Sequence, residues 1–137
     1  MQEQQDKSSE VRVVEAWHQA LNTDDIDRLV ALSHPNVEIG GPRGAGRGAQ
    51  LLREWIDRAR VRLEPRRLFR RGGTVVVQQA RQWRSAETGE VTGSQTVASV
   101  FAVSDEQVKS VMRYDDLSEA LEVAGIDHSD EMISRHR

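Results

Sequence analysis

The sequence predicts an α+β fold in which helices pack on one side of a single antiparallel sheet. Three short amphipathic helical patterns come first, and strand-like segments then run from Thr74 to Tyr114 with almost no helical signal. Helices followed by a run of antiparallel strands are typical of this fold class. Polar, aromatic and small residues also recur at every second position of these strands, and this mixture favours a lined pocket over a sealed core.

Two helices are predicted in the first quarter of the chain. Serines at the start can cap a first helix over Ser9–Asn22, and Asp24 can cap a shorter second helix that ends near Leu32. Apolar residues three or four positions apart define the inward face of the first helix, namely Val11, Val14, Trp17 and Leu21.

A short strand over residues 37–39 is followed by a glycine-rich loop over Gly40–Gly48 and a third helix over residues 49–60. The glycine spacing partly matches the fingerprint of dinucleotide-binding loops. However, the strand before the loop ends several residues too early, and the later chain has hairpins where that fold has helical crossovers. The segment is therefore interpreted as a flexible rim loop over the pocket.

Four strands are predicted after the third helix, over residues 61–70, 74–84, 91–103 and 107–114. Pro65 indicates that the first of them is an edge strand or is bulged, and Gly93 marks a bulge in the third. Asp116 can cap a last helix over residues 117–123, which Gly125 closes. The predicted single domain covers residues 9–126, with a flexible tail over 1–8 and a loose C-terminal tail over 127–137.

Composition narrows the class of protein. The 137 residues contain no cysteine, which excludes disulfides, thiolate catalysis and cysteine-based zinc sites. The N-terminal residues lack the apolar run of a signal peptide, and the longest uncharged stretch is too short and polar to span a membrane, so a cytoplasmic protein is expected. The four histidines are scattered along the chain, and we expect neither a metal ion nor another cofactor.

Charge is distributed unevenly, although the net charge is only −3. Residues 43–84 contain twelve arginines and three acids, so this segment carries +9 and the rest of the chain carries −12. One interpretation is a basic patch for an anionic partner such as nucleic acid. The other is that the arginines pair with acids within the fold, and we favour it because no nucleic-acid-binding motif accompanies the charge.

Two of the predicted strands carry most of the candidate ligand-binding residues. If their alternation turns one set inward, the pocket wall is formed by Gln79, Arg81, Trp83, Gln95, Ser99 and Phe101. A single bulge would turn the opposite set inward, but the aromatic rings favour the first arrangement because they prefer burial. Trp17 and Trp55 lie on apolar helix faces, where they either pack in the core or line the pocket.

Arg113 and Asp115 are the candidate catalytic residues. They are two positions apart at the end of the last predicted strand, so their side chains point the same way. The pair could bind a carboxylate or phosphate, or Asp115 could act as a general base while Arg113 and a glutamine polarise an oxygen. A structural ion pair at the strand end is the alternative.

Several segments resemble the SnoaL-like and ketosteroid-isomerase-like group of the nuclear transport factor 2-like superfamily, whose fold is cystatin-like. They are Val14–Trp17, Leu21–Asp27, Val37–Ile39, Gly48 with Arg53–Trp55, and Tyr114–Ile126. The resemblance implies a strongly curved sheet that forms a cone around the helices, an internal cavity open at one end, and a homodimer through the outer sheet face. It is specific for fold and not for activity, because this fold hosts isomerases, cyclases, hydrolases and non-catalytic binders.

The resemblance also indicates where the catalytic set of the ketosteroid isomerases would fall. The general-base aspartate falls at Ile39 or Gly40, the tyrosine at Trp17, and the second acid at or near Ser99, so none of the inherited groups is present. The expected function is the binding of a small, mostly apolar molecule, with or without isomerase, cyclase or hydratase chemistry. The alternative is a non-catalytic dimeric protein-interaction module that uses the outer sheet face and the arginine-rich surface.

Overall fold

The computed structural model describes residues 8–42, 44–59, 61–85 and 87–132. Its helices are α1 (Ser9–Asn22), α2 (Ile26–Ala31), α3 (Ala49–Ala59), α4 (Leu117–Ala124) and the short 3-10 helix η2 (His128–Asp130). Its strands are β1 (Ser33–Gly41), β2 (Gly44–Arg47), β3 (Val61–Arg71), β4 (Thr74–Arg84), β5 (Val91–Ser104), β6 (Gln107–Tyr114) and β7 (Glu131–Met132). Nearly all of the predicted N-terminal tail, and the end of the predicted C-terminal tail, lie outside the described residues.

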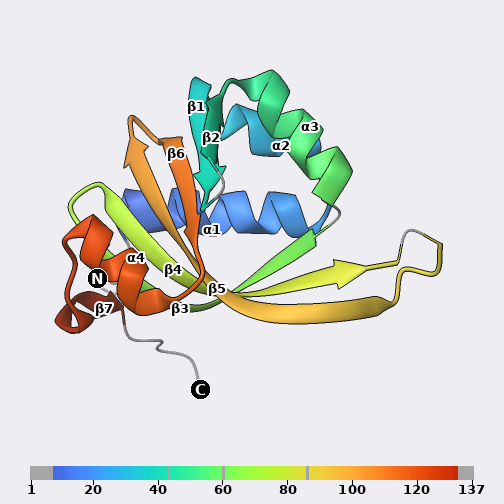
Figure 1. Ribbon diagram of the computed structural model, residues 1–137. Coiled ribbons are helices and arrows are strands. Elements are labelled where there is room, and N and C mark those ends of the chain that lie inside the picture. Colours follow the sequence, from blue (N-terminus) through green and yellow to red (C-terminus); the bar gives the residue numbers. More distant parts are fainter. Residues whose placement is uncertain (1–7, 43, 60, 86, 133–137) are drawn as a thin grey trace, which may run out of the picture.

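The strands of the described chain form one curved, unclosed sheet in the order β2-β1-β6-β5-β4-β3-β7. Helix α1 lies along its concave side, with α2 and α3 above it (Figure 1). The predicted α+β cone is confirmed, with one correction: the sheet is mixed, because β1 runs parallel to β6. Nearly half of the chain separates these two strands, so no short hairpin forces them to be antiparallel.

Local signals set the ends of the helices. Ser8 caps α1 and Asp116 caps α4, each by accepting a hydrogen bond from a backbone N–H of the first turn. Gly125 closes α4 in the left-handed conformation, with φ of 70°. The cap of α2 is Asp25 and not the predicted Asp24, which instead makes the turn at φ of 61°. None of the helices in the described ranges is long and apolar enough to cross a membrane.

The glycine-rich segment is a β-hairpin and not the predicted flexible loop. Strand β1 continues to Gly41, which pairs with Gly44 at the start of β2. The two strands approach closely, since a Cβ added to Gly40 would lie 2.6 Å from the Cβ of Ala45. Small residues therefore permit a tight pairing that strand propensity alone does not predict.

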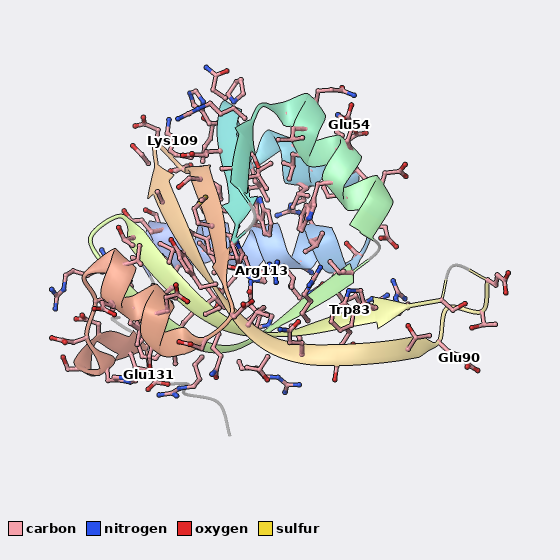
Figure 2. All side chains as sticks on the ribbon, viewed as in Figure 1. Glu54, Trp83, Glu90, Lys109, Arg113 and Glu131 are labelled. Carbon is pink, nitrogen blue, oxygen red and sulfur yellow. The ribbon has the colours of Figure 1, made fainter. Side chains whose placement is uncertain are left out.

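Strands β4 and β5 form a long hairpin whose turn end extends beyond the helices, with Trp83 and Glu90 toward that end (Figure 2). The predicted bulge at Gly93 is confirmed by a shift of register beside Trp83. The indole ring packs on the glycine, where an added Cβ would lie 3.0 Å from a ring carbon. Pro65 likewise coincides with a shift of register in β3.

Trp17 joins α1 to the sheet at the centre of the core. Only 1 % of the residue is exposed, and its ring meets Phe101 of β5 edge to face at 5.3 Å between centroids. Its Nε1 donates a hydrogen bond to Oγ of Ser33 at 3.2 Å, so the polar atom of the indole is satisfied within the protein. One side chain thus connects α1, β1 and β5.

Helix α4 packs on the convex face of the sheet, opposite α1. Its Ala120 and Leu121 contact Val76 of β4 and Ala98 of β5, and all four are buried. The prediction of helices on only one side of the sheet is therefore wrong. Both faces of the central strands are buried, because the strands alternate apolar residues toward α1 and toward α4.

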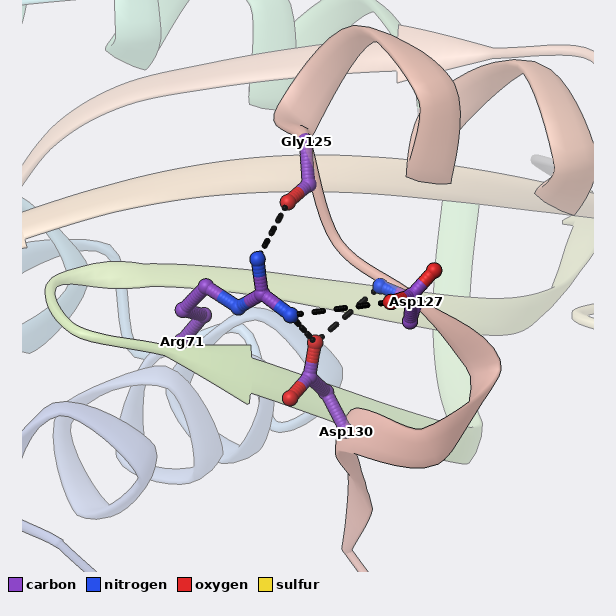
Figure 3. A network of polar contacts seen from close by, with 4 residues as sticks. All are labelled: Arg71, Gly125, Asp127 and Asp130. Atoms are coloured by element: carbon purple, nitrogen blue, oxygen red, sulfur yellow. Dashed lines mark hydrogen bonds and ion pairs between the residues drawn. The ribbon is translucent and has the colours of Figure 1, made fainter.

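The segment after α4 is attached to β3, so residues 127–132 are not the loose tail that the sequence predicts. Arg67 donates two hydrogen bonds, each of 2.9 Å, to the carboxylate of Glu131 in β7. Arg71 donates to the carbonyl of Gly125 at 3.1 Å and lies 2.9 Å from Asp130 (Figure 3). These contacts join residues far apart in the sequence, and local patterns cannot reveal them.

Replacing Trp17 with alanine should lower the free energy of unfolding by about 3–5 kcal/mol, because the indole fills the centre of the core. The matched control is Trp83→Ala on the β4–β5 hairpin, where the ring is half-buried and a loss of about 1 kcal/mol is expected. Chemical denaturation of both variants measures the difference. Equal losses would show that α1 does not depend on the Trp17 contact.

Candidate functional site

A pocket of about 680 Å³ opens between the concave face of the sheet, α1, α3 and the β1–β2 hairpin. This volume is in the usual range of small-molecule sites. Its lining consists of Trp17, Ile39, Gly40, Gly41, Gly44, Ala45, Gly46, Leu51, Trp55, Leu63, Arg81, Ser99, Val111 and Arg113. The positions to which the family resemblance assigns the ketosteroid isomerase base, tyrosine and second acid all lie in this lining.

Most of the lining is apolar. Trp17, Trp55 and Leu51 come from the helices, and Ile39, Leu63 and Val111 come from the strands. Because the indole N–H of Trp17 already donates to Ser33, the ring offers the pocket only apolar surface. A ligand would therefore gain free energy mainly by burying apolar surface against these side chains.

Glycines of the β1–β2 hairpin make room for the pocket and for Arg113. A Cβ added to Gly41 would lie 3.6 Å from both Nε and Nη2 of Arg113, so the guanidinium group packs along this glycine. A Cβ added to Gly46 would lie 2.5 Å from Leu51 of α3. Larger residues in the hairpin would fill the space between the hairpin, α3 and β6.

Two arginines supply the charge of the pocket. Arg81 is half-buried, and its pKa is lowered by that burial and then by the positive charge of Arg113. Its guanidinium group stacks on Trp83 at 4.8 Å from the ring centroid. Arg113 lies between the β1–β2 hairpin and the central strands (Figure 2). No acid is present among the described lining residues, so the pocket holds two like charges close together.

Asp115 lies outside this lining, and 64 % of its side chain is exposed. Its carboxylate is 3.9 Å from Nη1 of Arg113, which makes a long, solvent-screened ion pair. This position matches the structural alternative for the pair and gives no support to the expected general base.

A buried chain of hydrogen bonds leads from α1 to the pocket. His18 places Nδ1 2.8 Å from the carbonyl oxygen of Val14 and Nε2 2.8 Å from Nε2 of Gln79. Ser99 donates its hydroxyl proton to Oε1 of Gln79, also at 2.8 Å. His18, Gln79 and Ser99 are all buried, and Ser99 is the member that reaches the pocket. Such a chain holds each side chain in one orientation.

The structure brings together four of the predicted binding residues, Trp17, Trp55, Arg81 and Ser99, with the catalytic candidate Arg113. Gln79 is buried one layer behind Ser99, and Phe101 is buried against Trp17 in the core. Trp83 and Gln95 share the same strand face but lie toward the extended end of the β4–β5 hairpin, where Gln95 is exposed. The alternation of the strands therefore identifies the correct face but not where the helices stop covering it.

Sequence reasoning placed the glycine-rich segment at the rim of the pocket without naming any of its residues as a binding residue, and it missed Leu51, Leu63 and Val111. Val111 could have been found, because it precedes Arg113 by two positions and so shares its face. The hairpin residues approach the pocket through the pairing of β1 with β2 and β6, and Leu63 approaches it through its pairing with Arg81 of β4.

A second hollow of about 410 Å³ lies between the turn end of the β4–β5 hairpin and residues of α1, α2 and α3. Its lining includes the exposed acids Asp24 and Asp57 together with Arg84, so the charges can compensate one another. The larger pocket is the stronger candidate, because its charges are not compensated within the lining and a buried polar chain ends in it.

Comparison with known proteins places this fold in a family. A model of the SnoaL-like domain matches residues 14–111. A search of curated proteins finds no significant match.

Among solved structures, TerC co-crystallised with polyporic acid has 20 % identity and a TM-score of 0.69, covering 86 % of this chain and 99 % of its own. A nuclear transport factor 2-like protein of unknown function from Burkholderia pseudomallei has 18 % identity and a TM-score of 0.69, covering 85 % and 97 %. A protein with a ketosteroid isomerase-like fold from Catenulispora acidiphila, in complex with trimethylamine, has 17 % identity and a TM-score of 0.65, covering 84 % and 93 %. At these identities the likeness shows the fold alone.

Stability should fall in acid because of His18. Burial lowers its pKa from 6.5 to about 4, although the hydrogen bond to Val14 raises it in part. Between pH 6.5 and about pH 4, His18 is protonated in the unfolded chain but stays neutral in the folded chain. The free energy of unfolding therefore decreases as the pH falls through this range.

The shift in the pKa of His18 corresponds to a loss of about 3 kcal/mol in the free energy of unfolding across this pH range. Measuring the free energy of unfolding against pH for the wild type and for His18→Gln separates this loss from that of the carboxylates. If the free energy of unfolding depended on pH in the same way in both proteins, the predicted role of His18 would be contradicted.

Proposed function

This chain belongs to the family of SnoaL-like domains, and we propose that its pocket binds a small, mostly apolar molecule that carries one acidic group. The single observation that supports this proposal is the pair of arginines in a pocket whose described lining contains no acid. An anion between Arg81 and Arg113 would make charge-assisted hydrogen bonds and would relieve the repulsion between the two guanidinium groups.

The rest of the lining specifies the body of the ligand. Two tryptophans and five aliphatic side chains line the pocket with the arginines, and planar or aliphatic surface fits such walls. An acid without an apolar body would leave this surface in contact with water. We therefore infer an amphipathic ligand, with its acidic group at Arg81 and Arg113 and its apolar part toward Trp17 and Trp55.

Chemistry on such a ligand would use the arginines and not an inherited base. Isomerase, cyclase or hydratase reactions that pass through an enolate need hydrogen-bond donors or a positive charge at the oxyanion, and a guanidinium group supplies both. The base position of the ketosteroid isomerases carries Ile39 or Gly40, and Asp115 is exposed outside the lining. Binding is therefore the part of the function that the geometry supports best.

The proposed ligand class is inferred from the residues of the pocket and not from related structures, because these were crystallised with different ligands. TerC was crystallised with an acid, polyporic acid, and the Catenulispora acidiphila protein with an amine, trimethylamine. A protein of this fold can thus hold ligands of either charge, and the charge of its own lining decides between them. Two arginines without a lining acid favour the acid for this chain.

The alternative functions have less support. A protein-interaction module would need a large apolar outer face, but α4 covers apolar residues there, including Val76 and Ala98. A nucleic-acid surface would need free arginines, but many pair with acids within the fold: Arg47 with Glu38, Arg53 with Asp27, Arg66 with Glu64, Arg67 with Glu131, Arg70 with Glu10 and Arg71 with Asp130. The homodimer implied by the family resemblance stays a prediction, which light scattering would test.

Two fluorescent probes test the proposal. Anilinonaphthalene sulfonate is an aromatic anion, and phenylnaphthylamine has the same rings without the sulfonate. We expect the anion to bind the wild type more tightly than the neutral probe. Arg81→Gln and Arg113→Gln should each weaken binding of the anion roughly tenfold and leave the neutral probe nearly unchanged, because only the anion makes charged hydrogen bonds.

The matched control is Arg47→Gln, which removes the same charge from an exposed residue of β2 outside the lining. It should change binding of the anion by less than about twofold at physiological salt, because exposed charges are screened. If all three variants weakened binding of the anion equally, the effect would come from the net charge of the protein and not from the pocket. A wild type that prefers the neutral probe would contradict the proposed ligand class.

A further inference from the structure

The polar chain behind the pocket has a fixed direction, and this direction determines what Ser99 can offer a ligand. It begins at a backbone carbonyl in α1, passes through His18 and Gln79, and ends at the hydroxyl of Ser99. Each link is 2.8 Å long, so each contains one proton and one acceptor.

The direction is set at the carbonyl of Val14. A carbonyl oxygen can only accept, so Nδ1 of His18 must carry the proton in that bond. The ring is buried among Trp17, Phe101 and Gln79, where a second proton and its charge would be costly. Nε2 therefore has a lone pair and accepts.

The side-chain amide of Gln79 continues the chain in the same donor-to-acceptor order and connects it to β5. Its Nε2 group donates to Nε2 of His18, which leaves its Oε1 directed at Ser99. If the amide were turned around, its oxygen would meet the lone pair of His18, and two acceptors would face each other. The buried amide therefore has one acceptable orientation, in which Ser99 must donate.

The proton of Ser99 is thus committed to Gln79, and only the lone pairs of its hydroxyl oxygen remain for the pocket. Ser99 pairs directly with Arg113 across β5 and β6, so the two side chains start side by side on the concave face. The pocket therefore presents guanidinium donors next to a hydroxyl group that can only accept.

From this arrangement we propose that the ligand is a hydroxy acid, or an acid with an N–H group in place of the hydroxyl. Its acidic group lies at Arg81 and Arg113, and its hydroxyl or N–H donates a hydrogen bond to Ser99. This inference rests on the proposed function, since it names a second group on the same small apolar acid. His18 and Gln79 act as positioning residues, because they fix the role of Ser99 without touching the ligand.

Hydroxynaphthoic acids test the proposal, with the hydroxyl at different ring positions and each compound compared with its methyl ether. Both members of a pair keep the carboxylate and the rings, but only the phenol can donate. For the isomer whose hydroxyl reaches Ser99, we expect the wild type to bind the phenol about fivefold more tightly than the ether. Ser99→Ala should reduce this preference to near equality without weakening binding of the ether.

Gln79→Leu separates hydrogen-bond direction from size. It leaves Ser99 in place but frees its proton, so the hydroxyl could donate to an ether oxygen and the preference should shrink. A preference that persists in Ser99→Ala would arise from the bulk of the methyl group, and the proposal would fail. It would also fail if the preference in Gln79→Leu were as large as in the wild type, because the direction of the chain would then have no effect. It would also fail if the wild type showed no preference for any isomer.

The direction of the chain can be measured without any variant. In the isotope-labelled wild type at neutral pH, the imidazole nitrogen shifts of His18 should show a protonated Nδ1 and a bare Nε2. A proton on Nε2 would reverse the chain and overturn the proposal. Failure of the arginine variants to weaken binding of anilinonaphthalene sulfonate would instead count against the proposed function, so the two failures can be told apart.

Discussion

The seating of α1 on the concave face of β4 and β5 is the contact on which the rest of the structure depends. An edge-to-face contact joins Trp17 to Phe101, and a buried hydrogen bond joins His18 to Gln79. The apolar contact supplies most of the stabilisation, and the polar one specifies position, since a slip of one residue in β4 would turn Gln79 to the other face. His18 would then be buried without its partner, at a cost of about 1–3 kcal/mol.

The pocket exists because α1 fills only part of the concave face and the β1–β2 hairpin beside it consists largely of small residues. Glycines in the β1–β2 hairpin leave space that larger residues would occupy, and Arg113 extends along Gly41. Two half-buried guanidinium groups close together are unfavourable in the empty protein. Local interactions that destabilise the folded protein are typical of functional sites, where the same groups are needed for binding.

Much of the fold could be predicted from short-range signals. The caps at Ser8 and Asp116, the stop at Gly125 and the bulge at Gly93 follow from preferences of single residues. The candidate site was predictable in part, because alternation along β4 and β5 puts Arg81 and Ser99 on one face. The positions of Gln95 and Asp115 were not, since exposure depends on where other elements end.

The sequence by itself determined the four α-helices, the long strands and which face of each is apolar, because these depend on neighbours within a few residues. It did not determine β2 or β7, which exist only through pairing with β1 and β3. Only the tertiary structure decided that β1 runs parallel to β6, that α4 covers the convex face and that Arg67 holds Glu131. It also decided that His18, Gln79 and Ser99, from three separate elements, form one directed chain. Such contacts join residues many positions apart, and the free energy that selects them comes from packing the whole domain together.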